Sequence, residues 1–517
     1  MVRKSDNATR SYFEIEGISS SVDTLKAEVR AIYLDDQIPW VIGYSGGKDS
    51  TAVLQLIWTA ISELPLEKRD KPIHVISTDT LVENPVVDSW VSRSLDFMRE
   101  AAEVQHMPLQ AHRLTPEISD SFWVNLIGRG YAAPRNKFRW CTERLKIKPS
   151  NEFIRTMVQE NGEVILILGT RKAESVSRAR NMERHEKKAI GDRLTPNASL
   201  SNCVVYTPIQ DWSNDDVWMF LMRYPNSWGY NHKDLLSMYR GASADGECPL
   251  VVDSTTPSCG NSRFGCWVCT LVDEDKSMGA MIQNDEEKEW MLPMLQLRNE
   301  LDFRSEEARR VDRSRRDFRR ITGHLKYYTN KAGEPQLVPG PYKQDARSYW
   351  LRRVLQTQRW VRENGPSYVS DITLITSEEL REIRRLWVVE KHEIEDILPR
   401  IYQEELGEPY PETKIDDNLV FDFEALQSLK NICAGDGLHF ELSRNLLDIE
   451  RQFRTMNSRR GLFQALERAI ERCFYDNEED ALERAKDKQS LDQISAADME
   501  FLSSARRSLP LFPEDTD

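Results

Sequence analysis

The sequence predicts an α/β protein whose main domain is a doubly wound, parallel, five-stranded sheet, and three observations carry that prediction. Short apolar runs alternate with segments of helical periodicity from residue 36 onward. The first run ends in a glycine-rich turn that leads directly into a helix. The chain of 517 residues also exceeds the usual size of one hydrophobic core, so further domains are expected.

Five apolar runs are the expected strands, with helices between them. The strands cover residues 38–43, 73–77, 109–114, 163–168 and 203–206, and the helices lie near 49–62, 86–105 and 147–160. Ligands of such sheets bind at the carboxyl ends of the strands. A further helix is predicted to start near Ser213 as its N-cap, with Asp216 in its first turn.

Changes in composition divide the chain into four expected regions. Residues 1–35 are a leader with one helix, and residues 36–240 form the sheet domain. Residues 241–275 are rich in Gly, Ser, Asp, Pro and Cys, and residues 276–517 have the periodicity of packed helices. The start of the chain lacks a signal-peptide core and no apolar run is long enough to cross a bilayer, so we expect a cytoplasmic protein without a membrane partner.

The net charge of −14 argues against a protein that coats nucleic acid nonspecifically. The segment from Arg298 to Lys326 reverses this charge locally. It is either a solvated helix face, as its interspersed acids suggest, or a stripe that binds phosphates.

The turn after the first strand is an anion cradle. It reads Ser45, Gly46, Gly47, Lys48, Asp49 and Ser50. Glycines let the backbone close around a phosphate, the helix N-terminus points at its oxygens, and Lys48 adds a full charge. The common phosphate loop would need a glycine at Ile42 and a hydroxyl at Asp49, so this is a different loop. The alternative is a tight turn before an ordinary helix.

Polar residues at two other strand ends extend this candidate site. Thr78 and Asp79 follow the second strand, where a carboxylate can hold magnesium or the ribose and base of a nucleotide. Arg171 follows the fourth strand, and its guanidinium suits bidentate contact with phosphate, as does that of Arg178.

Two cysteine patterns predict further chemistry. Cys141 stands among Arg139, Arg144, Lys146 and Lys148, cations that would lower its pKa and make it nucleophilic; a buried, inert thiol is the alternative. Four other cysteines lie within 22 residues, which suits tetrahedral zinc or an iron-sulfur cluster better than two disulfides in a cytoplasmic chain. They are Cys248, Cys259, Cys266 and Cys269.

The motifs resemble those of a known superfamily. The loop at residues 45–50 is similar to that of N-type (PP-loop) ATP pyrophosphatases, and the order of motifs over roughly residues 36–225 resembles the phosphoadenylyl-sulfate (PAPS) reductase branch. The resemblance implies an adenine nucleotide alpha-hydrolase-like fold and cleavage of ATP between its α and β phosphates. Reductases of this branch carry a C-terminal Glu-Cys-Gly-x-His motif, which neither Cys433 nor Cys473 fits.

Within that branch, the four-cysteine set, residues 122–131 and the Arg139–Cys141 segment resemble the DndC family of bacterial DNA phosphorothioation. The resemblance implies an enzyme that adenylylates a DNA phosphate oxygen so that sulfur can replace it. It implies ATP and magnesium, a [4Fe-4S] cluster on the four cysteines with zinc as the alternative, and DNA, a cysteine desulfurase and other Dnd proteins as partners. Lys48, Asp49, Cys141 and Arg171 are then catalytic, and the loop, Thr78, Asp79, Arg139 and Arg171 bind the nucleotide.

Three other functions remain open on the sequence. A sulfonucleotide reductase is opposed by the missing C-terminal motif. A tRNA thiolase would use the same loop and a metal-bound cysteine set. A noncatalytic iron-sulfur scaffold that binds nucleic acid is supported by the arginine-rich segment and the long helical half of the chain.

Overall fold

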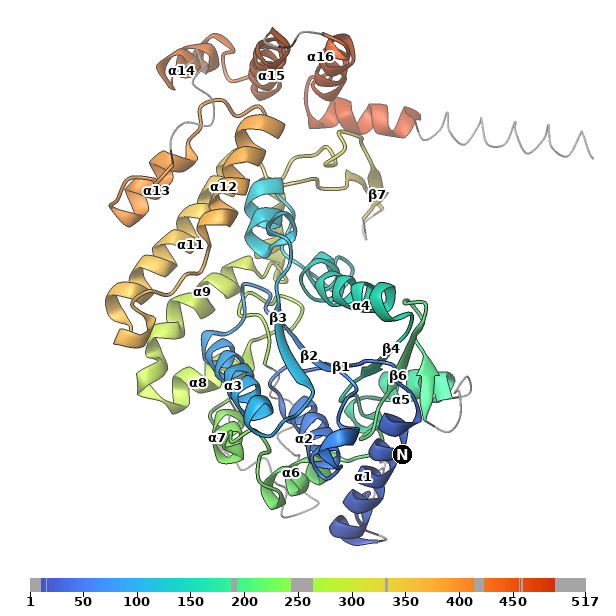
Figure 1. Cartoon of the computed structure of the whole chain (residues 1–517). Coiled ribbons are helices and arrows are strands. Elements are labelled where there is room, and N and C mark those ends of the chain that lie inside the picture. Colours follow the sequence, from blue (N-terminus) through green and yellow to red (C-terminus); the bar gives the residue numbers. More distant parts are fainter. Residues whose placement is uncertain are drawn as a thin grey trace, which may run out of the picture. The chain divides into compact units, whose positions relative to one another are not determined.

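The computed structural model describes residues 11–14, 16–186, 193–242, 264–330, 333–412, 423–454, 456 and 459–488. The chain forms two compact units (Figure 1). The first, here called the sheet unit, comprises Met1–Phe122, Ala133–Asp302 and Thr357–Thr376. The second, the helical unit, comprises Trp123–Ala132, Phe303–Gln356 and Ser377–Asp517.

The five predicted strands are all present in the sheet unit and are all parallel, as expected. A sixth strand, β5, was not predicted; it is short and pairs antiparallel with β6 at the edge of the sheet. Its Pro196 is tolerated there because an edge strand does not need every N–H donor. The strands are β1 (Trp40–Gly43), β2 (Ile73–Thr78), β3 (Leu109–Leu114), β4 (Val164–Ile167), β5 (Leu194–Pro196) and β6 (Cys203–Tyr206), in the order β3-β2-β1-β4-β6-β5.

The register of the central strands brings their carboxyl ends to one edge of the sheet. Trp40 of β1 pairs with Ile73 of β2 on one side and with Ile165 of β4 on the other. The loops that follow β1, β2 and β4 therefore emerge together. These loops contain the glycine-rich turn after β1, Asp79 after β2 and Arg171 after β4.

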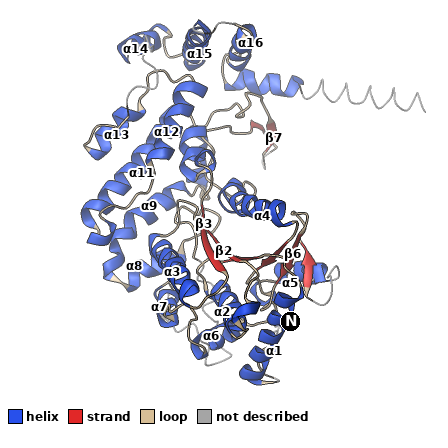
Figure 2. Cartoon of the chain, in the orientation of Figure 1, coloured by secondary structure: helices blue, strands red, loops and turns tan. Residues whose placement is uncertain are grey.

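Helices cover both faces of the sheet, which confirms the doubly wound class (Figure 2). On β1 the side chains alternate, so that Trp40 and Ile42 belong to one buried cluster and Val41 to another. The first cluster joins α1 (Gly17–Asp35), α2 (Lys48–Ser62), α3 (Pro85–Val104), α6 (Asn214–Arg223) and α7 (His232–Gly241), and the second joins α4 (Lys148–Asn161). The helices predicted near 49–62, 86–105 and 147–160 are thus present.

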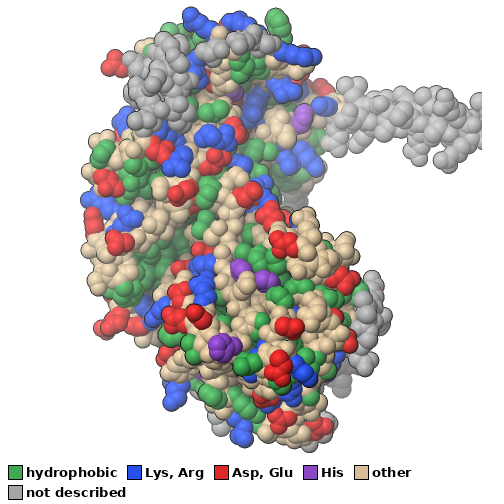
Figure 3. Space-filling view, viewed as in Figure 1, with side chains coloured by type: hydrophobic (Ala, Val, Ile, Leu, Met, Phe, Trp, Pro, Cys, Tyr) green, Lys and Arg blue, Asp and Glu red, His purple; other side chains and the backbone are tan. Residues whose placement is uncertain are grey.

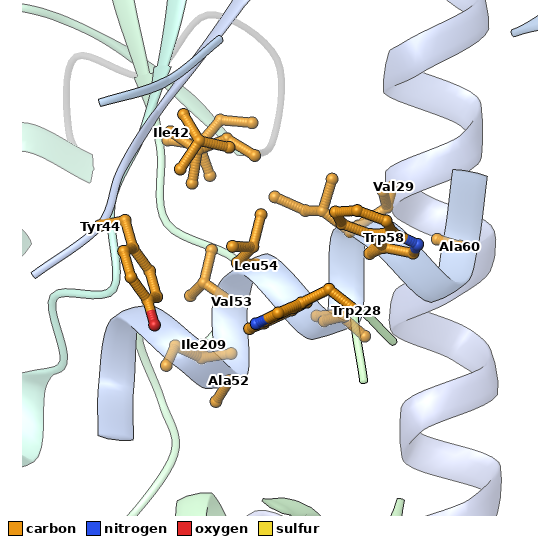
Figure 4. Close-up of a cluster of buried hydrophobic side chains, with 14 of the residues drawn as sticks. Val29, Ile42, Tyr44, Ala52, Val53, Leu54, Trp58, Ala60, Ile209 and Trp228 are labelled. Atoms are coloured by element: carbon orange, nitrogen blue, oxygen red, sulfur yellow. The ribbon is translucent and has the colours of Figure 1, made fainter. Parts of the chain in front are cut away.

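The expected N-terminal helix is part of this core. Val29 of α1 belongs to the larger cluster together with Ile42, Leu54 and Trp58 (Figure 4). The start of α6 is also as predicted: Ser213 Oγ accepts from Asp216 N at 3.1 Å, and the Asp216 carboxylate accepts from Ser213 N at 2.7 Å. This reciprocal capping fixes the direction in which α6 leaves the sheet edge.

The helical unit confirms the prediction of a mostly helical C-terminal region. Besides a two-stranded hairpin, β7 (Tyr327–Thr329) with β8 (Pro335–Leu337), it consists mainly of helices. They are α10 (Glu306–Ser314), the first part of α11 (Gln344–Asn364), α12 (Ser377–Arg385), α13 (Leu398–Leu406), α14 (Phe423–Ile432), α15 (Gly437–Arg454) and α16 (Leu462–Arg472). The sheet unit also contains α5 (Val176–Glu186), α8 (Lys276–Asn284) and α9 (Leu292–Leu301). In the described part of the chain, none of the helices combines the length and the apolar character that a membrane span requires.

Candidate functional site

A cavity of about 800 Å³ lies in the sheet unit at the carboxyl ends of β1, β2 and β4. This is where parallel α/β sheets bind ligands. The cavity brings together most of the residues that the sequence singles out for nucleotide binding. They are Ser45, Gly47, Lys48, Asp49, Ser50, Thr78, Asp79 and Arg171.

The turn between β1 and α2 has the backbone of an anion-binding loop. Gly46 has φ +73°, and its carbonyl accepts from Trp90 Nε1 at 3.0 Å. Gly47 is the N-cap of α2 and offers no side chain to cap the helix. Ser50 Oγ donates to Gly47 O at 3.0 Å and accepts from Ser45 N at 3.2 Å, which holds the turn closed. The positive end of α2 therefore opens into the cavity.

Replacement of Gly46 by alanine is expected to destabilise the sheet unit by about 2–4 kcal/mol. A Cβ at this position would lie 2.5 Å from Val91 Cγ2, in addition to the strain of a positive φ. Gly229 is the matched control because its φ is +81° and nothing lies within 4 Å of a Cβ there. Urea unfolding should show a small loss of stability for Gly229→Ala and a clearly larger loss for Gly46→Ala. Equal losses of stability would mean that the Val91 side chain shifts away from the new Cβ at no energetic cost.

Three charged side chains form a chain of ion pairs on the loop. Lys48 Nζ lies 3.2 Å from Asp49 Oδ2, and Arg171 Nε donates to Asp49 Oδ1 at 2.7 Å. Arg171 is 3% exposed and also donates to the carbonyl of Trp212 at 3.2 Å, so its position is fixed from two sides. Asp49 thus holds two cations at the mouth of α2, where the negative oxygens of a phosphate chain would be stabilised.

Tyr239 is a loop contact that the sequence does not reveal. Its hydroxyl accepts from Lys48 N at 3.2 Å, and a Cβ on Gly47 would come within 3.1 Å of it. Burial raises the pKa of this phenol, so it stays neutral. In the sequence it is one apolar position of an amphipathic helix, and periodicity cannot distinguish such a residue from ordinary core.

The second strand contributes an acidic side of the cavity. Asp79 Oδ2 lies 3.0 Å from Arg113 Nη2, and Arg113 also pairs with Asp88. Burial raises the pKa of Asp88, and Arg113 opposes that shift. Thr78 Oγ1 lies 3.1 Å from Ser150 Oγ. Arg113 was missed by the sequence analysis, although a basic residue near the end of a predicted strand was the available signal.

The carboxylates of the cavity fit the oxygen preference of magnesium. The side chains of Asp49 and Asp79 are 25% and 18% exposed, and both line the cavity. Each already neutralises a cation, yet a carboxylate has lone pairs for further partners. Hard oxygen ligands beside a phosphate loop are the usual protein contribution to a magnesium–nucleotide complex.

The expectation of a low pKa for Cys141 is wrong. Burial raises the pKa of this half-buried thiol, and repulsion from Cys269 adds to the shift. Two of the flanking cations are turned elsewhere: Arg144 pairs with Asp120, and Lys148 pairs with the same carboxylate at 2.8 Å. Lys146 still lowers the pKa of Cys141, but its effect is smaller than that of burial. A count of basic neighbours in the sequence overlooked Asp120, which neutralises Arg144 and Lys148.

The structure does not bring Arg139 and Cys141 into the lining of the cavity with the other predicted site residues. Neither is among the described residues that line the cavity. Arg139 donates from Nη2 to Asn136 Oδ1 at 3.3 Å on the surface. Arg178 does line the cavity, and it pairs with Glu174. Of the predicted arginines, the structure therefore brings Arg171 and Arg178 to the cavity.

Two of the four clustered cysteines can be described, and they lie in one turn. Cys269 N donates to Cys266 O at 3.0 Å. The thiol of Cys266 contacts Thr80 Oγ1 at 3.3 Å and Glu83 Oε1 at 3.7 Å, and burial raises its pKa to about 12. Cys248 and Cys259 lie outside the described residues. Among the described residues, no group of three or more potential ligands is arranged to hold a metal.

The Cys266–Cys269 turn is anchored by the backbone and by one buried arginine. Trp267 N donates to Val82 O at 2.9 Å, which ties the turn to the segment after β2. Arg298, 1% exposed, donates to the carbonyls of Cys269 at 2.9 Å and of Val272 at 2.5 Å. Arg298 is thus a buried structural residue, although the sequence places it in an exposed basic segment. The cysteine side chains are held beside Glu83 and Lys146, whose Nζ and Oε1 are 3.4 Å apart.

Comparisons with known proteins find similarity over part of the chain. Residues 39–271 match the family model of the phosphoadenosine phosphosulfate reductase domain. An uncharacterized protein of Methanocaldococcus jannaschii is 28% identical over 186 residues, which cover 36% of this chain and 32% of that protein. The chain thus spans about a third of that relative. A crystal structure of PAPS reductase from Candida auris in a phosphate complex is 17% identical, with a TM-score of 0.26, over 41% of this chain and 89% of that chain.

The family match and the cavity converge on one part of the chain. The matched residues include the glycine-rich loop, Asp79, Arg171 and the Cys266–Cys269 turn. Residues 39–271, which contain this cavity and the glycine-rich loop, are thus similar to the phosphoadenosine phosphosulfate reductase domain.

Proposed function

We propose that the sheet unit is an ATP pyrophosphatase of DNA phosphorothioation, similar to the DndC family. The observation that carries the proposal is the cavity in which Lys48, Asp49 and Arg171 meet the N-terminus of α2. Such a site stabilises the charge that develops on a leaving pyrophosphate. The cysteine set resembles that of the DndC family, and this resemblance suggests sulfur as the second reactant.

In the first step, a non-bridging oxygen of a DNA phosphodiester attacks the α-phosphorus of ATP. The bond between the α-phosphorus and the bridging oxygen to the β-phosphorus breaks, and pyrophosphate leaves. The α-helix N-terminus, Lys48 and Arg171 hold the leaving group, while Asp49 keeps both cations in place. The DNA oxygen is now part of AMP, a far better leaving group than an oxide.

In the second step, a sulfur nucleophile displaces AMP from the DNA phosphorus. We propose that Cys141 carries this sulfur as a persulfide, which it receives from a cysteine desulfurase. Attack by the terminal sulfur forms a phosphorus–sulfur bond and releases AMP with the former DNA oxygen. A thiol reductant must then supply two electrons to cleave the remaining sulfur–sulfur bond, which frees the phosphorothioate and the Cys141 thiol. The raised pKa of the free thiol is compatible with this role because a persulfide ionises more readily than a thiol.

Two inorganic groups belong to this proposal. Magnesium held near Asp49 and Asp79 would neutralise the phosphates of ATP. Cys266 and Cys269, together with Cys248 and Cys259, would hold a [4Fe-4S] cluster, with zinc as the alternative. Cys266 and Cys269 fit such a role because they share one turn, whose backbone is fixed by Val82 and Arg298.

Partners follow from the charge of the chain and from the resemblance. A net charge of −14 suggests that a complex presents DNA to this protein, rather than that the chain alone grips a duplex. A cysteine desulfurase and other Dnd proteins would complete the reaction. We propose that this assembly works in the cytoplasm.

The adenylylation step is tested by the products of ATP cleavage. Purified protein with ATP, magnesium and DNA should release pyrophosphate, and AMP should appear in solution only when a sulfur donor is added. Release of orthophosphate and ADP would overturn the step. The sulfonucleotide reductase alternative is favoured by the family match, and it predicts sulfite from phosphoadenylyl sulfate and a reductant. Sulfur in total DNA against sulfur in tRNA of a deletion strain separates DNA modification from tRNA thiolation.

Replacement of Cys141 by serine is expected to abolish sulfur incorporation into DNA while ATP still binds, because Cys141 is not among the described cavity-lining residues. Phosphorothioate content can be measured by mass spectrometry of digested DNA from complemented cells. Cys433→Ala is the control, since Cys433 follows α14 in the helical unit. Normal phosphorothioate in Cys141→Ser cells would remove Cys141 from the sulfur path.

A further inference from the structure

The helical unit contains a second and larger cavity, of about 1210 Å³, that the proposed reaction does not use. Segments from α11, α14, α15 and α16, the turn after α12 and the residues 317–321 line it. All of its described lining residues belong to this unit. Lysine and arginine side chains outnumber carboxylates among them. Figure 3 shows lysine and arginine side chains gathered on this part of the molecule, below α15 and α16.

Two buried arginines pair with three of the seven carboxylates among the described residues that line the cavity. Arg319, 3% exposed, donates to both Asp317 and Glu441 at 2.7 Å. Arg347, 3% exposed, pairs with Glu393, with one of its two contacts at 3.2 Å. Among the other described lining residues there are seven cations and four carboxylates, so positive charge remains in excess.

Lys391 is the most informative of these cations. It lines the cavity, and its ammonium group forms no ion pair or side-chain hydrogen bond with the described residues. Burial, with repulsion from Arg347, lowers its pKa to about 7. A half-buried amine without an ion pair is costly unless a ligand supplies the missing negative charge.

The backbone beside Lys391 is held in a strained conformation. His392 has φ +56°, a region that residues with a Cβ rarely adopt. Its Nδ1 lies 2.6 Å from Asp448 Oδ2, and Asp448 is fully buried in α15. Such strain persists when surrounding structure fixes it, and it is concentrated at ligand sites. Asn445, one turn earlier on α15, lines the same cavity, and its buried Oδ1 has no hydrogen-bond partner in the described residues.

Aromatic side chains accompany the cations. Phe318, Tyr342, Phe440 and Phe453 all line the cavity. Basic grooves with aromatic platforms bind single-stranded nucleic acid, because phosphates pair with the cations and bases stack on the rings. The volume also exceeds the roughly 300–1,000 Å³ of ordinary small-molecule pockets.

We propose that this cavity binds a segment of single-stranded nucleic acid, with a backbone phosphate on Lys391 and bases against the aromatic lining. The site is separate from the nucleotide cavity of the sheet unit. Its occupancy needs no ATP, so failure of this proposal and failure of the adenylylation step are distinguishable. Free polyphosphates share the phosphate chemistry but offer no bases to stack.

The test is direct binding of a fluorescein-labelled single-stranded DNA of about 12 nucleotides, within the ~4–16 nucleotides typical of such sites. Fluorescence anisotropy with the full chain, without ATP, should give a dissociation constant that Lys391→Met raises at least about tenfold. The matched control is Lys68→Met, which removes an exposed lysine of the sheet unit. Lys391→Met removes a half-buried charge and keeps an unbranched side chain of similar length, so thermal unfolding should show a folded protein of unchanged or higher stability.

The pH dependence adds a signature that a change in overall charge does not give. Lys391 is protonated below about pH 7, and Arg347, Glu393, Glu441, Arg472 and His392 surround it. The oligonucleotide should bind several-fold more tightly at about pH 6 than at about pH 8, and Lys391→Met should reduce that difference.

Three results would overturn the proposal. The first is equal weakening by Lys391→Met and Lys68→Met, which would reflect net charge alone. The second is an unchanged pH dependence in Lys391→Met. The third is displacement of the oligonucleotide by tripolyphosphate at the same phosphate concentration, which would identify a site for free polyphosphates rather than for a strand.

Discussion

Replacement of Lys48 by methionine is expected to lower the rate of ATP-dependent pyrophosphate release by roughly 100-fold or more. The ammonium group lies on the loop at the N-terminus of α2, 3.2 Å from Asp49, and its side chain is 12% exposed. In the proposed reaction it therefore meets the phosphates of ATP directly. Loss of a preorganised charge in a partly desolvated site affects the transition state more than ground-state binding. A coupled pyrophosphate assay measures the rate.

Two further variants separate this effect from trivial causes. Lys48→Arg keeps the charge but changes its shape, so activity should be intermediate. Lys68→Met removes an exposed lysine in the same unit and should leave the rate unchanged. The free energy of unfolding of Lys48→Met should stay close to that of the parent, because Lys48 contributes one partly exposed ion pair. A pyrophosphate rate within threefold of the parent would show that another group holds the phosphates.

The parallel sheet could be predicted because it depends on short-range patterns. Buried strands such as Val164–Ile167 are continuous apolar runs, and the helices between them have a clear period. The edge strand β5 was missed because three residues that include Pro196 carry no such signal. Its existence depends on pairing with β6, a contact that only the folded chain provides.

In the candidate site, too, short-range patterns could be predicted and contacts between distant segments could not. The loop residues and Arg171 could be predicted because each follows a strand end, where side chains of a parallel sheet meet. The electrostatics of Cys141 could not be predicted, because Asp120 is distant from the cations in the sequence pattern and close to them in the fold. Tyr239 was missed for a related reason: its hydroxyl contact with Lys48 N joins segments that are 191 positions apart.

Arg298 illustrates how a charge run can mislead. In the sequence it begins a basic segment that reads as exposed, whereas the structure buries it almost completely. Its guanidinium satisfies carbonyls of the Cys266–Cys269 turn and the following loop, which have no regular secondary structure to do so. Burial of this full charge is tolerated because the planar guanidinium has several N–H donors, which reach several carbonyl acceptors at once. The position of this residue should therefore control the cysteine turn.

Replacement of Arg298 by methionine is expected to destabilise the sheet unit by about 3–5 kcal/mol. The change leaves the carbonyls of Cys269 and Val272 without their donor and removes an ion pair with Asp302 at 3.4 Å. Urea unfolding followed by tryptophan fluorescence gives the loss of stability. Below the transition, Cys266 and Cys269 should react faster with a thiol reagent, because the turn that buries them opens more often.

Two variants make this prediction specific to the buried hydrogen bonds. Arg298→Lys keeps one positive charge but lacks the fork of donors, so its stability should lie between those of the parent and Arg298→Met. Arg400→Met is the exposed control: its side chain is 63% exposed and pairs with Glu404 at 2.7 Å, so stability should change by no more than about 0.5 kcal/mol. If Arg298→Met unfolds at the same urea concentration as Arg400→Met, the carbonyls of the turn find other donors. In that case the cysteine turn is held by its backbone pairing with Val82 and not by Arg298.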